Sequence, residues 1–334
     1  MRRLRAEWER QNAVLMAFPH IDTDWAKDGN LNRSFAPFIR IAQAIAYSQT
    51  VYILCKDAKQ IRDLFCSTQN MVFIETDYND TWCRDYGPIS IERDLKPALI
   101  DFRFDGWGGK FEASFDDMVN KSLHKKGYFG TTPMESVPFV LEGGSIESDG
   151  EGTILTTTKC LCNPNRNGGL SKSEVEENLN RYLGTKRVLW LENGYLEGDD
   201  TDSHIDMLAR FTSKDTIVYI ECNDSSDIHY HTLKELKKEL KLLKKEDGSS
   251  YNLIALPMCE PKYQNNHRLP ASYANFLITN KAVLYPTYEA PKTDKETGVI
   301  LKQIFPNKEI IPIPSLKLIT QGGSIHCSTM QIIY

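Results

Sequence analysis

The chain has 334 residues, with 40 Lys and Arg against 45 Asp and Glu, which gives a formal net charge of −5. Its 41% hydrophobic and 25% charged residues exclude an intrinsically disordered chain, and the mild acidity argues against a nucleic-acid partner and favours a cationic small ligand. No run approaches the roughly 20 apolar residues of a membrane helix, and the N-terminus is too polar for a signal peptide, so we expect a cytoplasmic protein with no membrane partner.

Short runs of β-branched and aromatic residues predict strands along the chain. These runs are 51–55, 71–75, 187–191, 216–220, 282–285 and 310–314. Apolar residues at helical spacing predict helices at 35–47, 171–183 and 231–248. The second helix opens with a capping box at Ser171 or at Ser173, and Gly248 is expected to end the third. Alternating strands and helices indicate an α/β protein.

Five segments each combine a polar, turn-prone cluster with a following strand. They lie near 79–91, 140–158, 199–220, 268–286 and 318–334. The clearest echo is EGGSI at 142–146 against QGGSI at 321–325, which two unrelated turns could also produce. Repeats at a loose period of this kind predict a cyclic fold. We therefore expect one domain over 1–334, with five modules around a central active site, and not two domains joined by a linker.

Reactive side chains stand at the starts of four of these modules. They are Asp85, Glu142, His204, Asp206 and Cys327. A thiol becomes a nucleophile when a nearby cation lowers its pKa, and a histidine held by a carboxylate can act as general acid and base. A cysteine protease has no use for two further carboxylates beside its nucleophile, whereas a guanidinium pairs with carboxylates through its five N–H donors. The set therefore predicts a cysteine nucleophile that attacks a cationic guanidine.

Structural interpretations compete with this prediction. Asp85 lies where aspartate is a normal turn residue, and His204 could be a hydrogen-bonded core histidine. The eight cysteines form no CxxC pair and are expected to be mostly reduced and buried. Among His204, Asp206, His326 and Cys327 no paired HxxxH, HExxH or CxxC spacing occurs, so we expect no metal.

Six motifs in order carry a resemblance to a known family. They are NDTWCRDYGP, VLEGGS, CNPNRNGGLSK, GDDTDSHIDMLARF, RLPASYANFLITN and GGSIHC, and the similarity extends from Ala6 to the end of the chain. This pattern resembles the agmatine deiminase family, a branch of the guanidino-modifying enzymes with the five-bladed α/β pentein fold. The resemblance implies hydrolysis of agmatine to N-carbamoylputrescine and ammonia without a cofactor.

The same resemblance implies roles for single residues. Cys327 matches the nucleophile that forms a covalent amidino-cysteine intermediate, and His204 matches the general acid and base. Asp85 and Asp206 match the pair that binds the guanidinium, and Glu142 matches the partner of the histidine.

The far end of the substrate decides which guanidine is accepted. Agmatine ends in an ammonium, which acidic or aromatic groups would meet, whereas free arginine carries a carboxylate that calls for a basic residue. Trp82 and Asp200 match family residues that line the agmatine channel, and Asp80 and Gly323 complete the predicted substrate-binding set. A solvated turn is the alternative for any one aspartate of the run 199–202.

Two positions depart from the family pattern. Ser203 stands where a glycine is usual before the histidine, and Ser324 where an asparagine is usual before the cysteine; both could alter loop shape. His326 is expected to point away from the site if its segment is extended.

Other functions stay open at this stage. One is deimination of free or peptide-terminal arginine or of another small guanidine. Another is an inactive scaffold that binds a polyamine or a protein. Many family members self-associate, so the resemblance allows a homo-oligomer.

Overall fold

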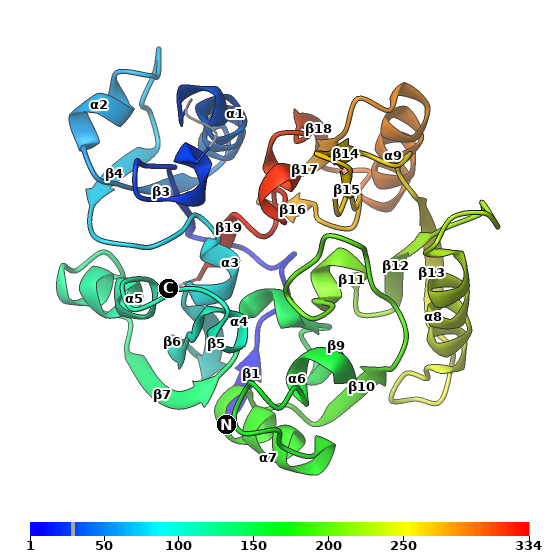
Figure 1. Cartoon of the computed structure of the whole chain (residues 1–334). Coiled ribbons are helices and arrows are strands. Elements are labelled where there is room, and N and C mark those ends of the chain that lie inside the picture. Colours follow the sequence, from blue (N-terminus) through cyan, green and yellow to red (C-terminus); the bar gives the residue numbers. More distant parts are fainter. Residues whose placement is uncertain (28–30, 334) are drawn as a thin grey trace.

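Strands with one pairing pattern recur along the chain (Figure 1). The structure is a computed structural model that describes residues 1–27 and 31–333. Within these residues, hydrogen bonds join the strands into five sheets of three or four strands and one two-stranded hairpin. In spatial order the larger sheets are β1 (Arg2–Leu4), β5 (Ile89–Arg93), β6 (Lys96–Arg103) and β7 (Met134–Val140); β10 (Arg187–Leu191), β9 (Thr153–Thr157) and β8 (Ile146–Ser148); β11 (Ala209–Ser213), β12 (Thr216–Glu221) and β13 (Asn252–Pro257); β16 (Leu277–Ile278), β17 (Ala282–Thr287) and β18 (Glu309–Pro314); and β19 (Thr329–Ile332), β2 (Ala13–Ala17), β3 (Thr50–Cys55) and β4 (Met71–Glu75). The hairpin pairs β14 (Tyr263–Gln264) with β15 (His267–Arg268).

Each larger sheet contains an antiparallel pair whose second strand also pairs in parallel with a third. A parallel pair needs a crossover, and helices supply it in every case. The helices that follow the second strands are α1 (Phe35–Ala46), α4 (Gly106–Gly109), α5 (Asp116–Lys125), α6 (Thr158–Leu161), α7 (Lys172–Leu183), α8 (Tyr230–Leu242) and α9 (Pro291–Ile304), while α2 (Ala58–Arg62) joins β3 to β4. Figure 1 shows the sheets around the middle of the molecule, with α2, α5, α7, α8 and α9 toward its edge.

The predicted strands are confirmed as β3, β4, β10, β12, β17 and β18, and two of the predicted helices as α1 and α7. The capping box of α7 is the one that starts at Ser171, whose partner is Glu174. The third helix, α8, ends at Leu242 and not at Gly248. Lys244 pairs with Ser250 in an isolated bridge, and Gly248 shapes the turn between them at a φ of 81°. The lysine-rich composition continues past the point where this backbone pairing ends the helix.

The buried hydrophobic residues of all five larger sheets belong to one contiguous core. Every residue of β2, which pairs on both sides, is buried, as expected for a strand covered on both faces. All eight cysteines are described and unpaired; Cys66 is exposed, Cys162 is half-buried and the others are buried. Among the described residues, no helix has the length and apolarity that crossing a membrane requires.

A short helical turn precedes the first strand of several sheets. These turns are α3 (Cys83–Tyr86) before β5, η3 (Gly143–Ser145) before β8 and η4 (Ile205–Met207) before β11; residues 273–274 and 325–328 form turns before β16 and β19. They coincide with the five polar segments of the sequence, except that residue 334 lies outside the described residues. Because the first strands lie toward the middle of the molecule, these turns bring polar side chains from distant parts of the chain together.

Candidate active site

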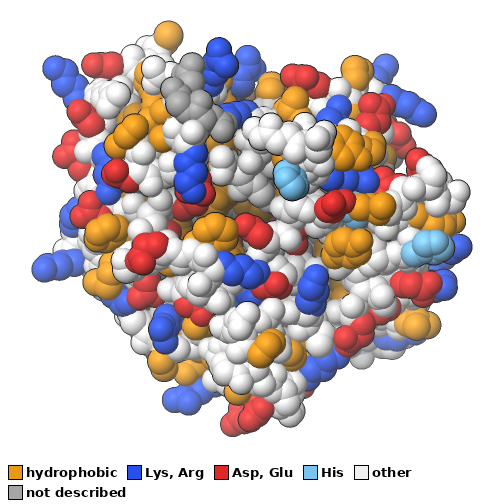
Figure 2. Space-filling view, in the orientation of Figure 1, with side chains coloured by type: hydrophobic (Ala, Val, Ile, Leu, Met, Phe, Trp, Pro, Cys, Tyr) orange, Lys and Arg blue, Asp and Glu red, His pale blue; other side chains and the backbone are white. Residues whose placement is uncertain are grey.

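A cavity of about 260 Å³ lies among these turns. In Figure 2 the surface is hollowed near the centre of the face shown, where hydrophobic and acidic side chains lie side by side. The cavity is lined by eight of the nine predicted site residues: Asp80, Trp82, Asp85, Asp200, His204, Asp206, Gly323 and Cys327. The ninth, Glu142, lies behind the histidine, with its Oε2 atom 3.9 Å from His204 Nε2.

Cys327 lies in the turn before β19, so the extended conformation expected for its segment is wrong. The side-chain amide of Asn275 donates a hydrogen bond to Sγ at 3.0 Å, and Asp206 Oδ2 lies 3.6 Å from the same sulfur. Burial, together with the charges of Asp206 and Asp85, raises the pKa of the Cys327 thiol well above its ordinary value. The thiol is therefore protonated in the absence of a cation and is poised to ionise when one binds.

His204 precedes η4, and the strand expected at 204–206 is wrong because Ile205–Met207 form a 3-10 turn. The imidazole Nδ1 lies 3.6 Å from Asp85 Oδ1, and Nε2 faces Glu142. Burial opposes the charged ring, but Asp85, Cys160 and Glu142 outweigh this effect and raise the pKa of His204 well above its ordinary value. The histidine is therefore protonated and can act as an acid.

Asp85 is fixed by two donors. Trp107 Nε1 donates to its Oδ2 atom, and the backbone N–H of Gly144 donates to Oδ1, both at 2.9 Å. Burial is the main cause that raises the pKa of Asp85 to about 6. A Cβ atom at Gly144 would lie 2.7 Å from His204 Nδ1, 2.9 Å from Asp85 Oδ1 and 3.1 Å from Asp206 Oδ2. Glycine is required here because these three groups enclose one small space.

Trp82 forms part of the wall on the other side of the cavity. A Cβ atom at Gly323 would lie 2.6 Å from the Trp82 ring and 3.0 Å from Cys327 Cβ, so a side chain there would displace both. Ser324 Oγ accepts a hydrogen bond from Tyr288 at 3.3 Å, and Ser203 adopts a φ of 68°, which explains why glycine is usual at that position.

The charge of the lining is one-sided. Six aspartates line the cavity, and no lysine or arginine does so among the described residues; the six are Asp24, Asp80, Asp85, Asp199, Asp200 and Asp206. Burial raises the pKa of Asp80 to about 7, and burial together with Asp199 raises that of Asp200. Asp202, from the same acidic run, does not line the cavity, because it binds Lys110 at 2.7 Å and Arg166 at 2.6 Å.

Three groups beside the predicted residues were missed from sequence. Asn275 contacts the nucleophile, and Arg166 Nε donates to Glu142 Oε1 at 2.6 Å. His326 does not point away as expected: its Nδ1 lies 2.8 Å from Asp206 Oδ2 and its Nε2 lies 2.7 Å from Glu7 Oε1. Arg166 and Asn275 stand inside the quoted motifs, but no spacing reveals their contacts.

Comparisons with known proteins agree with this site. A family model described as Porphyromonas-type peptidyl-arginine deiminase matches residues 3–332. A Legionella pneumophila protein named "Putative agmatine deiminase" is 34% identical over 98% of this chain and 93% of its own length. A crystal structure of a "Putative Arginine Deiminase" from Porphyromonas gingivalis is 44% identical, with a TM-score of 0.93 over 99% of this chain and 98% of that one. A cysteine-to-serine variant of a C. jejuni agmatine deiminase with substrate bound is 36% identical, with a TM-score of 0.92 over 100% of this chain and 97% of that one.

Proposed function

The chain belongs to the Porphyromonas-type peptidyl-arginine deiminase family, and we propose that it hydrolyses agmatine to N-carbamoylputrescine and ammonia through a covalent intermediate on Cys327. The observation that carries this proposal is the acidic, cation-free lining of the cavity. Agmatine is a dication, with a guanidinium at one end and an ammonium at the other. A single substrate of this kind would use both the deep and the outer carboxylates.

The deep end of the cavity fits a guanidinium. Asp85 and Asp206 approach the same space around Gly144, and two carboxylates offset the desolvation of a buried planar cation. The bound cation also removes the repulsion that keeps the Cys327 thiol protonated, so the thiol loses its proton to solvent as the substrate binds. The nucleophile is thus formed only when its target is in place.

The first half-reaction forms a carbon–sulfur bond. The thiolate of Cys327 attacks the guanidinium carbon, and His204, which starts as an imidazolium, gives its proton to the departing amino group. Ammonia leaves, and the enzyme keeps an amidino-thioether that carries the aminobutyl chain. Glu142, held by Arg166, lies against the imidazole and balances its charge.

The second half-reaction uses the same histidine as a base. Neutral His204 takes a proton from water, the resulting hydroxide attacks the amidino carbon, and the carbon–sulfur bond breaks. The products are N-carbamoylputrescine and the free Cys327 thiolate. No cofactor takes part in these steps.

The outer end of the cavity fits the ammonium. Asp80, Asp200 and the face of Trp82 are proposed to bind it, and Gly323 keeps the wall open beside the indole. Free arginine would bring a carboxylate to these aspartates and is expected to bind poorly.

We extend the proposal to the architecture around this cavity. The five larger sheets are proposed to be the five blades of a pentein, formed by one domain over 1–334. The shared order of an antiparallel and a parallel pair, and the pairing of β19 with β2, support this proposal.

Trapping of the intermediate tests the proposed reaction. Acid quenching of the protein during turnover of agmatine should add to the intact mass that of agmatine less one ammonia, located on Cys327 by peptide mapping. The Cys327→Ser variant should bind agmatine without any adduct. An enzyme that turns over agmatine with no adduct would contradict the covalent route, and a protein that neither reacts nor is trapped would be the inactive scaffold.

A further inference from the structure

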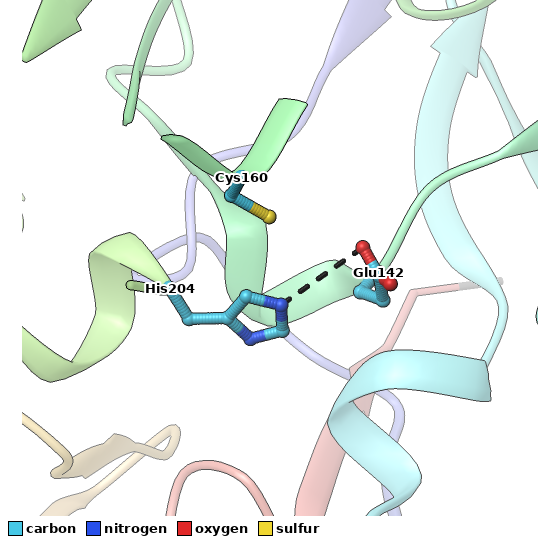
Figure 3. A group of neighbouring side chains, drawn as sticks. All are labelled: Glu142, Cys160 and His204. Carbon is cyan, nitrogen blue, oxygen red and sulfur yellow. Dashed lines mark ion pairs between the residues drawn. The ribbon is translucent and has the colours of Figure 1, made fainter. Parts of the chain in front are cut away.

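A second thiol, unused by the proposed reaction, lies beside the histidine. Cys160 of α6 is fully buried, and its sulfur, one atom of His204 and one oxygen of Glu142 all lie within 4.8 Å of one another. Figure 3 shows the three side chains converging on one space from different segments of the chain. This group is called the Cys160 cluster below.

The polar atoms of the Cys160 cluster are not satisfied within the protein. Glu142 Oε2 and both ring nitrogens of His204 have no hydrogen-bond partner, although the two side chains are 0% and 1% exposed. Buried polar atoms without a partner are costly and call for an explanation. Here they point at one another and at a thiol, so a ligand placed between them would satisfy all of them together.

The chemistry of these donors selects the ligand. A thiolate, an imidazole and a carboxylate are the groups that bind Zn²⁺, which often takes three protein ligands and leaves a fourth position open. Bonds of about 2.0–2.3 Å in a tetrahedron place ligand atoms roughly 3.3–3.8 Å apart. The observed 3.9 Å between Glu142 Oε2 and His204 Nε2 is already close to this separation.

We propose that Glu142, Cys160 and His204 form a Zn²⁺-binding site that inhibits the enzyme. The ion would displace the thiol proton of Cys160 to solvent and take the lone pair of His204 Nε2. The inhibition, but not the binding, rests on the proposed function. A metal-bound imidazole cannot pass a proton to ammonia or take one from water, so turnover stops while the ion is bound.

The surroundings of the Cys160 cluster support this assignment. Zinc-bound histidines turn their other nitrogen toward a carboxylate, and Asp85 Oδ1 lies 3.6 Å from His204 Nδ1. Arg166 binds Glu142 through Oε1 only, which orients the carboxylate and leaves Oε2 for the ion. Because His204 lines the cavity, an ion can reach Nε2 from the side on which substrate binds.

A second group with suitable donor types carries no such proposal. Glu7, Glu147 and His326 also place one ligand atom each within 4.8 Å of one another. Their carboxylates are already bonded to the guanidinium groups of Arg84 and Arg210, which fill the space that an ion would need.

Binding can be tested without turnover. Co²⁺ replaces Zn²⁺ as a coloured probe, and the Cys327→Ser variant removes the thiol of the nucleophile. Titration of this variant should give the near-ultraviolet absorption of one cobalt–thiolate bond per chain. The absorption should persist in Cys327→Ser with Cys162→Ala, the matched control two residues away, and vanish in Cys327→Ser with Cys160→Ala. An unchanged signal in the last variant, or no signal in Cys327→Ser, would overturn the site, provided that near-ultraviolet circular dichroism shows each variant folded.

Inhibition is tested on the active enzyme. Zn²⁺ should abolish ammonia release from agmatine, and a chelator should restore it. Relative to its own metal-free rate, Cys160→Ala should need at least ten times more Zn²⁺ for half inhibition, whereas Cys162→Ala should behave as the unmodified protein does. Equal sensitivity of Cys160→Ala would show that the ion acts through Cys327, and the proposal would be wrong. Lack of any turnover would instead contradict the proposed function and leave the cobalt result to decide the site.

Discussion

At the level of single residues, the site keeps its nucleophile uncharged until a cation arrives. The two carboxylates nearest Cys327 oppose the thiolate, and Asn275 is the one side chain found to donate a hydrogen bond to the sulfur among the described residues. Asn275 Oδ1 also accepts from the backbone N–H of His326 at 2.9 Å. The amide therefore both orients the turn and stabilises the charged sulfur.

Asn275→Ala should slow the reaction because the thiolate loses its donor. A hydrogen bond to a charged group contributes about 1.5–3 kcal/mol, so we expect kcat/KM for agmatine to fall by about 10- to 100-fold. The pH dependence of alkylation by iodoacetamide should show a higher pKa for the Cys327 thiol in the variant. An unchanged alkylation profile would mean that the amide serves the fold alone.

The aspartates of the lining predict how substrate affinity depends on pH. The pKa values of about 7 for Asp80 and about 6 for Asp85 mean that both carboxyls take up protons as the pH falls from 8 to 6. A neutral carboxyl attracts a cation weakly, so the KM for agmatine should rise by about tenfold over this interval. Asp80→Asn should start with a high KM and show a flatter rise. A KM that is constant, or that falls toward pH 6, would contradict this assignment.

At the level of elements, the site depends on the short turns that precede the first strands. The strands themselves were predictable because their β-branched and aromatic runs, such as β3 and β12, carry their own signal. The 3-10 turn at Ile205–Met207 carries no such signal, so the sequence suggested a strand there. The Asn275–Cys327 contact joins residues 52 apart in sequence and exists only because two turns face each other. For this reason the motifs disclosed the catalytic set but not the residues that position it.

The turn before His204 contains a strained position that can be relieved. Ser203 has a φ of 68°, and its buried hydroxyl has no hydrogen-bond partner. Ser203→Gly should raise the free energy of unfolding by about 1 kcal/mol, because it removes both the left-handed strain and the unpaired group. Urea denaturation measures this change. Ser203→Ala removes only the hydroxyl and should gain less; an equal or larger gain for alanine would show that the backbone is not strained.

At the level of the whole molecule, the two ends of the chain support one site. The C-terminal strand β19 pairs with β2, and Glu7 from the N-terminal segment binds Arg84, Arg210 and His326. His326 in turn contacts Asp206, so buried charges from the start, middle and end of the chain are connected. The net charge of −5 matters mainly through the few aspartates that this arrangement gathers in the cavity.

This connectivity predicts that the chain unfolds as one unit. Differential scanning calorimetry should show one transition whose calorimetric and van't Hoff enthalpies agree. Glu7→Gln should lower the transition temperature because it leaves buried guanidinium groups without their partner. Two resolved transitions would contradict a single domain over 1–334.

The proposed function depends most directly on which guanidine the protein consumes. Purified protein should be incubated at neutral pH with agmatine, free arginine and a peptide with C-terminal arginine, each in parallel with the Cys327→Ser variant. We predict equal amounts of ammonia and N-carbamoylputrescine from agmatine, little product from the other two substrates, and none from the variant. Faster release of ammonia from arginine or from the peptide, or undiminished activity of Cys327→Ser, would contradict the proposal.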